Sequence, residues 1–429
     1  MTENGTKKPS VRKLTVDNFS VIKHAELEFG KITVLIGPQA SGKSLLCRLA
    51  YFLGQVVPES VNGLALLRET EKKLIEVIEQ EFKEKFPLQT WGDEKGEIVY
   101  SSELFTISLS IGRKGAEFEA RLDTKFLERF GTWVNQHRAE GSANEVTKAL
   151  RTGTVGADGP FQFNESVYIP AGRASFSTPN RGFASISKSG KNLDWIMQRF
   201  PNEIDWEYRA MIEPSIPSSD LLPQFYEDAV GILGGRVIRV GGQLFFSSLR
   251  EGGDMLPFHW LSSGTQELLP LMNPLANLVY NVSTNPLSAW ESFRSKIGPI
   301  FVEEPELSVF PSTQYELMRL FAWLSGEERL GFPFVITTHS PYVLTVFGDL
   351  IKAGKIAVDR PERSAEVAAV IPEKYWIKPG DFAAYKIEDG NLLSIFDRES
   401  GEIDADYLDD VSSKISEEFG QLLEIQYGE

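Results

Sequence analysis

The spacing of apolar residues changes repeatedly along the chain and predicts alternating strands and helices. Runs that alternate or are continuously apolar predict strands at residues 14–29, 32–36, 97–122, 236–260, 300–303 and 334–338. Runs with apolar residues three or four positions apart predict helices at residues 44–54, 68–86, 125–150, 193–211, 265 onward, 312–324 and after Pro341. This alternation indicates an α/β fold, in which helices cover both faces of a mostly parallel sheet.

Two of the predicted helices carry specific sequence signals. Gly54 follows the apolar run that begins after Ser44, and a glycine in this position predicts the end of that helix. Leu74, Ile78 and Phe82 lie four residues apart among charged residues, so we expect this helix to bury one face and expose the other.

The composition is that of a globular protein. Of the 429 residues, 42% are hydrophobic and 24% are charged, which suffices for a packed core and excludes a disordered chain. Cys47 is the single cysteine, which excludes an intrachain disulfide and a multi-cysteine zinc site and favours a reducing compartment. The sequence shows neither an apolar run of about 18 residues nor a signal-peptide pattern, so we expect a cytoplasmic protein with no membrane contact.

Charge is distributed unevenly along the chain. Residues 388–429 include 13 acidic and 2 basic side chains and carry most of the net charge of −16, which argues against the wrapping of long nucleic acids. The segment between Glu165 and Asp194 contains no acidic residue but four basic ones: Arg173, Arg181, Lys188 and Lys191. This basic segment is a solvated loop, a sensor of ATP or a surface that binds an acidic partner.

A phosphate-binding motif lies at residues 37–44, where GPQASGKS fits G-x-x-x-x-G-K-[ST] between a predicted strand and a predicted helix. Glycines let successive backbone N–H groups turn towards phosphate oxygens, and the helix start adds a partial positive charge. Lys43 can then reach the β- and γ-phosphates, and the Ser44 hydroxyl can ligate Mg²⁺. We therefore predict a site for ATP and Mg²⁺ formed by Gly37, Pro38, Gln39, Ala40, Ser41, Gly42, Lys43, Ser44 and Leu45.

A pair of carboxylates follows the apolar strand predicted at residues 300–303. In P-loop ATPases, acidic side chains at the end of such a strand hold Mg²⁺ through water and orient or deprotonate the attacking water. We assign Glu303 to the metal and Glu304 to the attacking water. Alone, the pair would also fit a solvated strand end, but the phosphate-binding motif upstream favours the catalytic interpretation.

Two further elements complete the predicted site. His339 follows the strand at residues 334–338 and is expected beside the phosphate site, because the carboxyl ends of parallel strands share one edge of the sheet. There His339 would hydrogen-bond the γ-phosphate or the attacking water. Ser262, Ser263 and Gly264 open the helix predicted from residue 265, and form either a second anion site or an ordinary helix N-cap.

In this order, the four elements resemble the ATP-binding-cassette (ABC) ATPase heads of SMC-like, RecF-like and OLD-type proteins. The opening LTVDNFSVIKHAELEFGKITVLIGPQASGKS is similar to the start of those heads, with Gln39 where asparagine is commoner. Residues 261–264 resemble the family's signature motif, and His339 its switch histidine. Glu303 differs from the aspartate typical of transporter and SMC heads, and Gln89 and Gln162 are the candidates for the Q-loop glutamine.

The resemblance implies composite ATP sites. In such heads the signature of one protomer closes over the nucleotide held by another, so Ser262, Ser263 and Gly264 would contact the γ-phosphate bound by a second copy. A homodimer or higher homo-oligomer is therefore implied. The expected fold is a P-loop NTPase with an ABC-ATPase-like head, which combines a mostly parallel sheet flanked by helices with an antiparallel β subdomain.

Two short motifs, EEPE at residues 303–306 and YIPAGR at residues 168–173, resemble the prokaryotic ATPases of anti-phage defence operons, such as PtuA-type and AriA-type subunits. This resemblance implies an ATP-hydrolysing subunit that senses a trigger, nucleic acid or a phage protein, and controls a separate toxic effector such as a nuclease. Arg173, within the second motif, is the candidate sensor. The alternatives are a RecF- or SMC-like DNA-repair ATPase that loads on DNA in an ATP-dependent manner, and an assembly scaffold that binds ATP statically.

The predicted elements divide the chain into four parts. Residues 1–60 form an N-terminal lobe with the phosphate-binding loop, and residues 61–235 a helical and β insertion lobe. Residues 236–355 form the core with the signature, the Walker B carboxylates and the switch histidine. Residues 356–429 form a C-terminal α+β segment with the acidic tail. Because no long heptad stretch lies between Ser44 and Leu261, we expect a compact head without an SMC arm.

Overall fold

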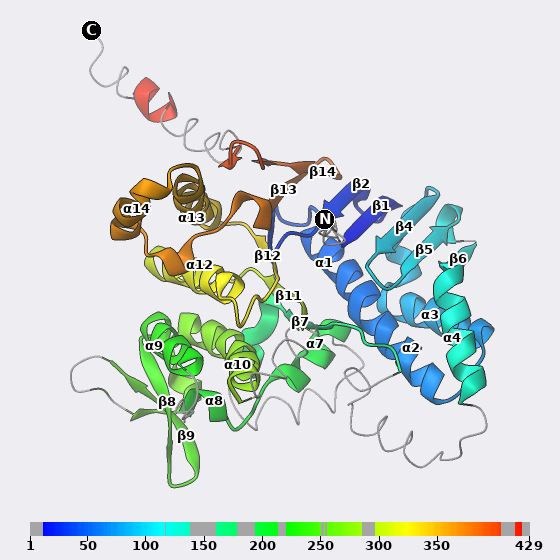
Figure 1. Ribbon diagram of the computed structural model, residues 1–429, viewed down its shortest axis with the longest axis horizontal. Helices are drawn as coiled ribbons and strands as arrows, with labels where there is room; N and C mark the ends of the chain where they lie inside the picture. Colours follow the sequence, from blue (N-terminus) through cyan, green and yellow to red (C-terminus); the bar gives the residue numbers. More distant parts are fainter. Residues whose placement is uncertain are drawn as a thin grey trace, which may run out of the picture.

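An eleven-stranded sheet organises this protein, whose computed structural model describes residues 12–115, 117–137, 160–177, 194–212, 220–249, 253, 255–284, 297–404 and 417–422. Within these residues the strand order is β6-β5-β4-β1-β2-β14-β13-β3-β12-β11-β7 (Figure 1). Five adjacent strands are parallel: β13 (Phe382–Glu388), β3 (Ile32–Ile36), β12 (Phe334–Thr338), β11 (Ile297–Glu303) and β7 (Glu165–Ile169). The antiparallel part comprises β1 (Lys13–Phe19), β2 (Ile22–Glu28), β4 (Gly96–Ser101), β5 (Thr106–Ile111) and β6 (Phe118–Leu122), and β14 (Asn391–Ser394) joins the two parts.

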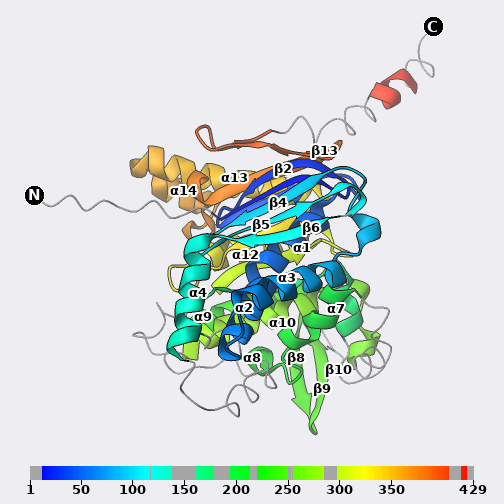
Figure 2. The ribbon, with the colours of Figure 1, turned by 90° about the vertical axis from the view of Figure 1, so that its right-hand side faces the viewer.

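Helices cover both faces of the parallel strands (Figures 1 and 2). One face carries α1 (Lys43–Tyr51), the π-helical turn η1 (Phe52–Val56), α2 (Val57–Leu66), α3 (Glu71–Lys85) and α4 (Thr124–Gln136). The other face carries α9 (Leu221–Leu233), α10 (Ser263–Thr284), α12 (Pro311–Gly326) and α13 (Pro341–Asp359). Figure 2 shows the β8–β9 hairpin projecting away from the sheet.

The remaining elements are short. The helices are α7 (Trp195–Arg199), α8 (Arg209–Ile212) and α14 (Ser364–Val370), and the strands are β8 (Gly235–Val240), β9 (Gln243–Ser248), β10 (Met255–Leu256), β15 (Phe396–Asp397) and β16 (Glu402–Ile403). The 3₁₀ turns are η2 (Leu88–Thr90), η3 (Arg113–Gly115), η4 (Ala171–Phe176), η6 (Phe200–Glu203), η7 (Phe258–Trp260), η8 (Pro361–Arg363), η9 (Glu373–Tyr375) and η10 (Pro379–Asp381).

Two hydrophobic cores lie on the two faces of the parallel strands. Side chains alternate along a strand, so Ile300 and Val302 of β11 pack with α9, α10, α12 and α13, whereas Phe301 packs with α1 to α4. All seven residues of β11 are buried. This double burial explains the continuous apolar runs from which the central strands were predicted.

Most sequence-based predictions are confirmed. The α/β fold with a mostly parallel sheet, flanking helices and an antiparallel part is observed. Leu74, Ile78 and Phe82 form the buried face of α3, which Thr70 caps by accepting a hydrogen bond from the backbone N–H of Lys73. The helix predicted at residues 125–150 is observed as α4 up to Gln136, and its residues 138–150 lie outside the described residues.

Two element boundaries predicted from the sequence are wrong. Gly54 does not end the first helix, which continues through η1 into α2; a Cβ at Gly54 would lie 2.9 Å from the hydroxyl of Tyr100, so glycine serves close packing there. The single helix predicted at residues 193–211 is instead α7, the 3₁₀ turn η6 and α8. Pro201 explains the break, because its ring lacks the N–H that would continue α7.

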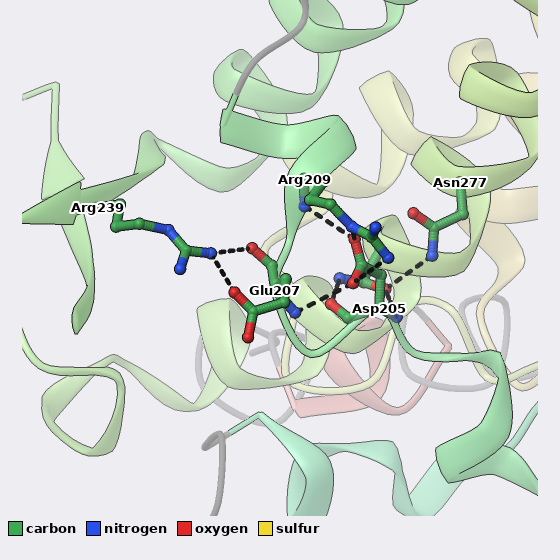
Figure 3. Close-up of polar contacts among 6 residues, drawn as sticks. Asp205, Glu207, Arg209, Arg239 and Asn277 are labelled. Carbon is green, nitrogen blue, oxygen red and sulfur yellow. Dashed lines mark hydrogen bonds and ion pairs between the residues drawn. The ribbon is translucent and has the colours of Figure 1, made fainter. Parts of the chain in front are cut away.

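A polar cluster ties the middle of α10 to the segment before α8. Asn273, buried in α10, accepts a hydrogen bond from the backbone N–H of Asp205 (2.8 Å) and donates to its carbonyl (2.9 Å). The carboxylate of Asp205 accepts from the backbone N–H groups of Glu207 (3.1 Å) and Arg209 (2.9 Å), as Figure 3 shows. Arg239 of β8 donates to Glu207, which extends the cluster to the β8–β9 hairpin. The helix that begins at the predicted signature is therefore anchored about midway along its length.

Within the part of the chain that the structure describes, no helix is both long enough and apolar enough to cross a membrane.

Candidate nucleotide-binding site

The phosphate-binding motif forms the turn between β3 and α1. β3 is fully buried, and α1 begins at Lys43 directly after Gly42, whose φ of 109° places it in a backbone region that favours glycine. Lys43 follows this turn as the first residue of α1. The backbone N–H groups at the start of α1 therefore face the turn, as phosphate binding at a helix N-terminus requires.

Lys43 points into this loop. Its ammonium donates hydrogen bonds to the carbonyls of Gly37 (2.7 Å) and Pro38 (2.8 Å). Burial lowers the pKa of Lys43, and the nearby Glu304 and Glu306 oppose this shift. The hydroxyl of Ser41 is buried without a hydrogen-bond partner among the described residues. An ammonium, an unpartnered hydroxyl and a helix start in one loop fit a bound triphosphate, whose oxygens would replace the carbonyls as acceptors of Lys43.

Glu304 and His339 stand opposite this loop. Glu304 follows β11 and adopts a positive φ of 42°, while its backbone N–H bonds the carbonyl of Thr337 at the end of β12 (2.9 Å). Its carboxylate lies 3.3 Å from Nε2 of His339. Both side chains, with Lys43, line a cavity of about 520 Å³ together with Ser20, Val21, Gln39, Ala40, Ser41, Gly42, Ser44, Leu45, Arg48, Lys85, Phe86, Pro87, Thr90 and Trp195. The structure thus brings together the three residues predicted to be catalytic.

Glu303, in contrast, does not line this cavity. Its buried carboxylate accepts hydrogen bonds from the hydroxyl of Tyr168 (2.6 Å) and the backbone N–H of Ala171 (3.2 Å), and lies 3.9 Å from Nε of Arg48. Burial and the neighbouring Glu303 raise the pKa of Tyr168, so its hydroxyl stays protonated and donates to the carboxylate. The role of Glu303 at the metal stays a prediction.

Two side chains near the site were not found from the sequence. Arg48 lines the cavity and pairs with Asp194, yet lies outside the phosphate-binding motif. Glu306 accepts hydrogen bonds from the hydroxyl of Thr338 (2.6 Å) and the backbone N–H of His339 (2.8 Å). Glu306 is the last residue of the EEPE motif, so that motif was the available sequence signal. The hydrogen bonds of Glu306 fix the backbone at His339.

The predicted signature lies at the exposed start of α10, outside the cavity described above. Ser262 and Ser263 are exposed, and the hydroxyl of Ser262 accepts a hydrogen bond from the backbone N–H of Thr265 (3.3 Å) as an N-cap. A Cβ at Gly264 would lie 2.8 Å from the carbonyl oxygen of Ser308, so glycine lets α10 approach the turn that follows Glu304. The signature is thus packed against the carboxylate loop of its own chain.

Arg173 is fully buried in η4, the turn that follows β7. Its guanidinium donates hydrogen bonds to the backbone carbonyls of Glu303 (2.7 Å), Glu304 (3.0 Å) and Glu267 (3.1 Å). A side chain with no exposed surface does not itself touch a partner protein, so its role as a sensor stays a prediction that has to act through these contacts. The other basic residues of that segment, Arg181, Lys188 and Lys191, lie outside the described residues.

The two Q-loop candidates do not join the cavity. Gln89 is exposed in η2, and Gln162 lines a different cavity together with Lys31 and Pro333, the residues that precede β3 and β12. That cavity lies at the amino ends of the parallel strands, opposite the phosphate-binding loop.

A family model described as "AAA domain, putative AbiEii toxin, Type IV TA system" matches residues 32–345, which is more than half of the chain. The chain belongs to this family. The match extends from β3, which leads into the phosphate-binding loop, to α13, which follows His339, and so includes the phosphate-binding motif, the carboxylates, the histidine and the predicted signature. Membership of this family makes the chain an ATPase of the AAA class. No curated protein matches the chain.

Several solved structures are similar in fold at low identity. The SMC head domain from Thermotoga maritima is 13% identical, with a TM-score of 0.36 over 90% of this chain and 98% of that chain. An Smc head with an extended coiled coil, bound to the C-terminal domain of ScpA derived from Pyrococcus furiosus, is 13% identical, with a TM-score of 0.41 over 96% and 100%. The recombination mediator protein RecF of the RecFOR pathway is 11% identical, with a TM-score of 0.36 over 90% and 98%.

The position of Lys43 leads to a first prediction. Lys43→Ala removes the ammonium aimed into the loop, and we expect ATP affinity to fall by about 100-fold or more, because a charge-assisted hydrogen-bonded contact is lost. Isothermal titration calorimetry measures this loss. Lys72→Ala, which changes a highly exposed lysine on α3, serves as the control and keeps full affinity. Affinity like that of the unaltered protein in Lys43→Ala would refute the phosphate-binding assignment.

Proposed function

We propose that the protein binds ATP with Mg²⁺ and hydrolyses the γ-phosphate bond at sites composed of two copies of the chain. The observation that carries this proposal is the convergence of Lys43, Glu304 and His339 on one cavity at the carboxyl ends of β3, β11 and β12. A cation for the phosphates, a carboxylate for the attacking water and a second polar group beside that carboxylate are what hydrolysis of a phosphoanhydride requires.

The residues take separate roles in this reaction. Lys43 binds the β- and γ-phosphates, and Glu304 orients the attacking water and accepts its proton. His339, 3.3 Å from Glu304, hydrogen-bonds the same water or the γ-phosphate. Ser44, which lines the cavity, and Glu303, which does not, would hold Mg²⁺, and the ion would supply positive charge that neutralises the phosphate oxygens. Within the described residues, no group of three or more His, Cys, Asp and Glu side chains is arranged to hold a metal ion.

Exposed apolar side chains around the site support a second copy as the partner. Trp260 precedes the signature, Phe310 follows the turn after Glu304, and Tyr342 follows His339, with exposed fractions of 71%, 75% and 55%. The close approach of Gly264 to Ser308 joins the first two segments into one surface. Large apolar side chains exposed beside functional loops are typical of interfaces. A two-fold dimer would cover them and bring each signature to the other copy's ATP.

We propose that in the cell this ATPase is the sensor subunit of a prokaryotic anti-phage defence system. It controls a separate toxic effector, for which a nuclease is the first candidate. The family description, which names a putative toxin of a Type IV toxin–antitoxin system, supports a role in such systems. The acidic balance of the chain favours a protein partner, with nucleic acid or a phage protein as the trigger. The alternative is an ATP-dependent DNA-repair clamp of the RecF or SMC kind.

Glu304→Gln separates binding from hydrolysis. We expect it to keep Mg²⁺–ATP bound but to slow turnover by about 10²-fold or more, because general-base assistance is typically worth that factor. Steady-state phosphate release and light scattering after gel filtration measure the rate and the trapped dimer. Glu316→Gln, at an exposed position of α12, is the matched control and keeps the normal rate. Normal turnover in Glu304→Gln with loss of turnover in Glu303→Gln would reverse the assigned roles.

Composite sites are tested by mixing two variants in a Glu304→Gln background. Ser262→Arg blocks the signature and Lys43→Ala blocks the phosphate loop, so neither chain alone forms a dimer around ATP. In a mixed dimer, one interface pairs an intact phosphate loop with an intact signature. We expect mixed dimers that retain one ATP each, measured with radiolabelled nucleotide after gel filtration. Mixed dimers that retain no ATP would contradict composite sites.

The effector proposal is tested in cells that carry the native locus. Affinity-tagged Glu304→Gln, held in its ATP-bound form, is expected to recover a subunit that arrests growth when that subunit is expressed alone. Mass spectrometry identifies this subunit, and Lys43→Ala provides the nucleotide-free comparison. Recovery of DNA and repair proteins without any toxic subunit would favour the DNA-repair alternative, in which charge reversal at Arg181, Lys188 and Lys191 weakens salt-sensitive DNA binding.

A further inference from the structure

Arg173 joins the end of β11 to the second turn of α10. One side of its guanidinium donates to the carbonyls of Glu303 (2.7 Å) and Glu304 (3.0 Å), at the end of β11. The other side donates to the carbonyl of Glu267 (3.1 Å), in the second turn of α10, and lies 3.4 Å from a carboxylate oxygen of the same residue. With the carbonyl of Pro170 (3.1 Å), the guanidinium donates to four carbonyls, which its five N–H donors allow and the three donors of an ammonium do not.

The contact with α10 has two alternative acceptors. Nε of Arg173 bonds the backbone carbonyl of Glu267, while the carboxylate oxygen of Glu267 at 3.4 Å is buried and has no hydrogen-bond partner among the described residues. The two distances differ by a few tenths of an ångström. A small displacement of α10 therefore exchanges one acceptor for the other while the charge of Arg173 stays paired, which is the behaviour expected of a two-state contact.

The contact with β11 acts on a constrained backbone. Glu304 has a positive φ of 42°, which a non-glycine residue adopts at an energetic cost, so surrounding bonds must hold it. Its N–H bonds Thr337, and its carbonyl accepts from Arg173. Loss or rotation of the guanidinium removes one of these bonds and allows the carboxylate to move away from His339.

We propose that Arg173 is a positioning residue that transmits the engagement of the signature helix α10 to Glu304 of the same chain, and thereby couples the two ATP sites of the dimer. This inference rests on the proposed composite sites. In a two-fold dimer, α10 of one chain meets the ATP held by the partner, whereas Glu304 acts on the ATP held by its own chain. The link through Arg173 makes hydrolysis at one site depend on ATP at the other.

The polar cluster on α10 explains how the helix passes this displacement on. The side chain of Asn273 is bonded to the backbone of Asp205, so α10 is held at this point while its start is exposed. Gly264 packs against Ser308 beside the same turn, which keeps the start of α10 in contact with the carboxylate loop. A displacement of the start of α10 therefore also displaces Glu267 and the turn after Glu304.

The first test replaces the guanidinium while keeping its charge. For Arg173→Lys we expect ATP affinity within about twofold of the unaltered protein, kcat lower by about 10- to 100-fold because Glu304 is misplaced, and a Hill coefficient for ATP that falls towards one. Glu267→Gln keeps the backbone carbonyl and alters only the second acceptor, so it lowers the Hill coefficient with a smaller loss of kcat. Arg363→Lys, at an exposed position, is the control and changes neither value.

The second test uses the mixed dimer of Ser262→Arg and Lys43→Ala with Glu304 intact. The chain that holds ATP there has a blocked signature, so coupling predicts that the retained ATP is hydrolysed at less than about a tenth of the normal rate per site. A full rate of hydrolysis per site would overturn the coupling but leave the composite sites standing, whereas absence of retained ATP in the Glu304→Gln form of the same mixed dimer would overturn the composite sites themselves. Unchanged kcat and Hill coefficient in both Arg173→Lys and Glu267→Gln would overturn the role of Arg173. If Arg173→Lys fails to fold by circular dichroism, the result for Glu267→Gln decides.

Discussion

The parallel pairing of β13, β3, β12, β11 and β7 is the constraint on which the rest of the structure depends. Their carboxyl ends share one edge of the sheet, and neighbouring strands lie about 4.8 Å apart. The phosphate loop, Glu304 and His339 follow β3, β11 and β12, so residues about 300 positions apart in sequence converge on one cavity. Because these strands are buried on both faces, two hydrophobic cores fix their register. The fixed register in turn fixes the relative positions of the site residues at the strand ends.

The same edge of the sheet carries several carboxylates close to one another, and their mutual repulsion requires buried cations beside them. The end of β11 and the turn after it carry three carboxylates that are buried or half-buried, those of Glu303, Glu304 and Glu306. Charges in such positions are tolerated only when they are paired and hydrogen-bonded. Lys43, in the phosphate loop, lies near Glu304 and Glu306. Arg173 places a positive charge beside the same turn by donating hydrogen bonds to the backbone carbonyls of Glu303 and Glu304. Lys43 and Arg173, the cations next to these carboxylates, therefore permit the acidic turn to fold.

Local signals in the sequence were enough for the central strands and for the motif residues. Glu304 and His339 directly follow apolar strands, and Lys43 ends the loop after another, so their meeting at one edge could be predicted from topology alone. The position of β13 beside β3 could not be predicted, because a pairing between segments 350 residues apart leaves no local pattern. Gly54 was misread for the same reason: the residue that requires it, Tyr100, lies on a distant strand.

The contacts of Arg173 were equally invisible in the sequence, because it bonds mostly to backbone carbonyls, which every residue has. Its basic segment suggested a surface contact, whereas the structure shows a buried guanidinium that donates hydrogen bonds to backbone carbonyls of β11 and α10 and of the residue after β11. Sequence patterns report which side chains are apolar or charged, and for that reason they identify motif residues better than the residues that position them.

The geometry of α10 bears on how far a displacement at the signature would reach. Along an α-helix the rise is about 1.5 Å per residue, so Ser263 lies about 15 Å, and Glu267 about 9 Å, from the anchored Asn273. If α10 pivots at this anchor, a shift at the signature arrives at Glu267 reduced only to about three fifths. Since the two acceptors of Arg173 on Glu267 differ in distance by a few tenths of an ångström, a movement of about half an ångström at the start of the helix would suffice to exchange them. Closure of a dimer interface produces shifts of that size through side-chain packing alone, without any change of fold.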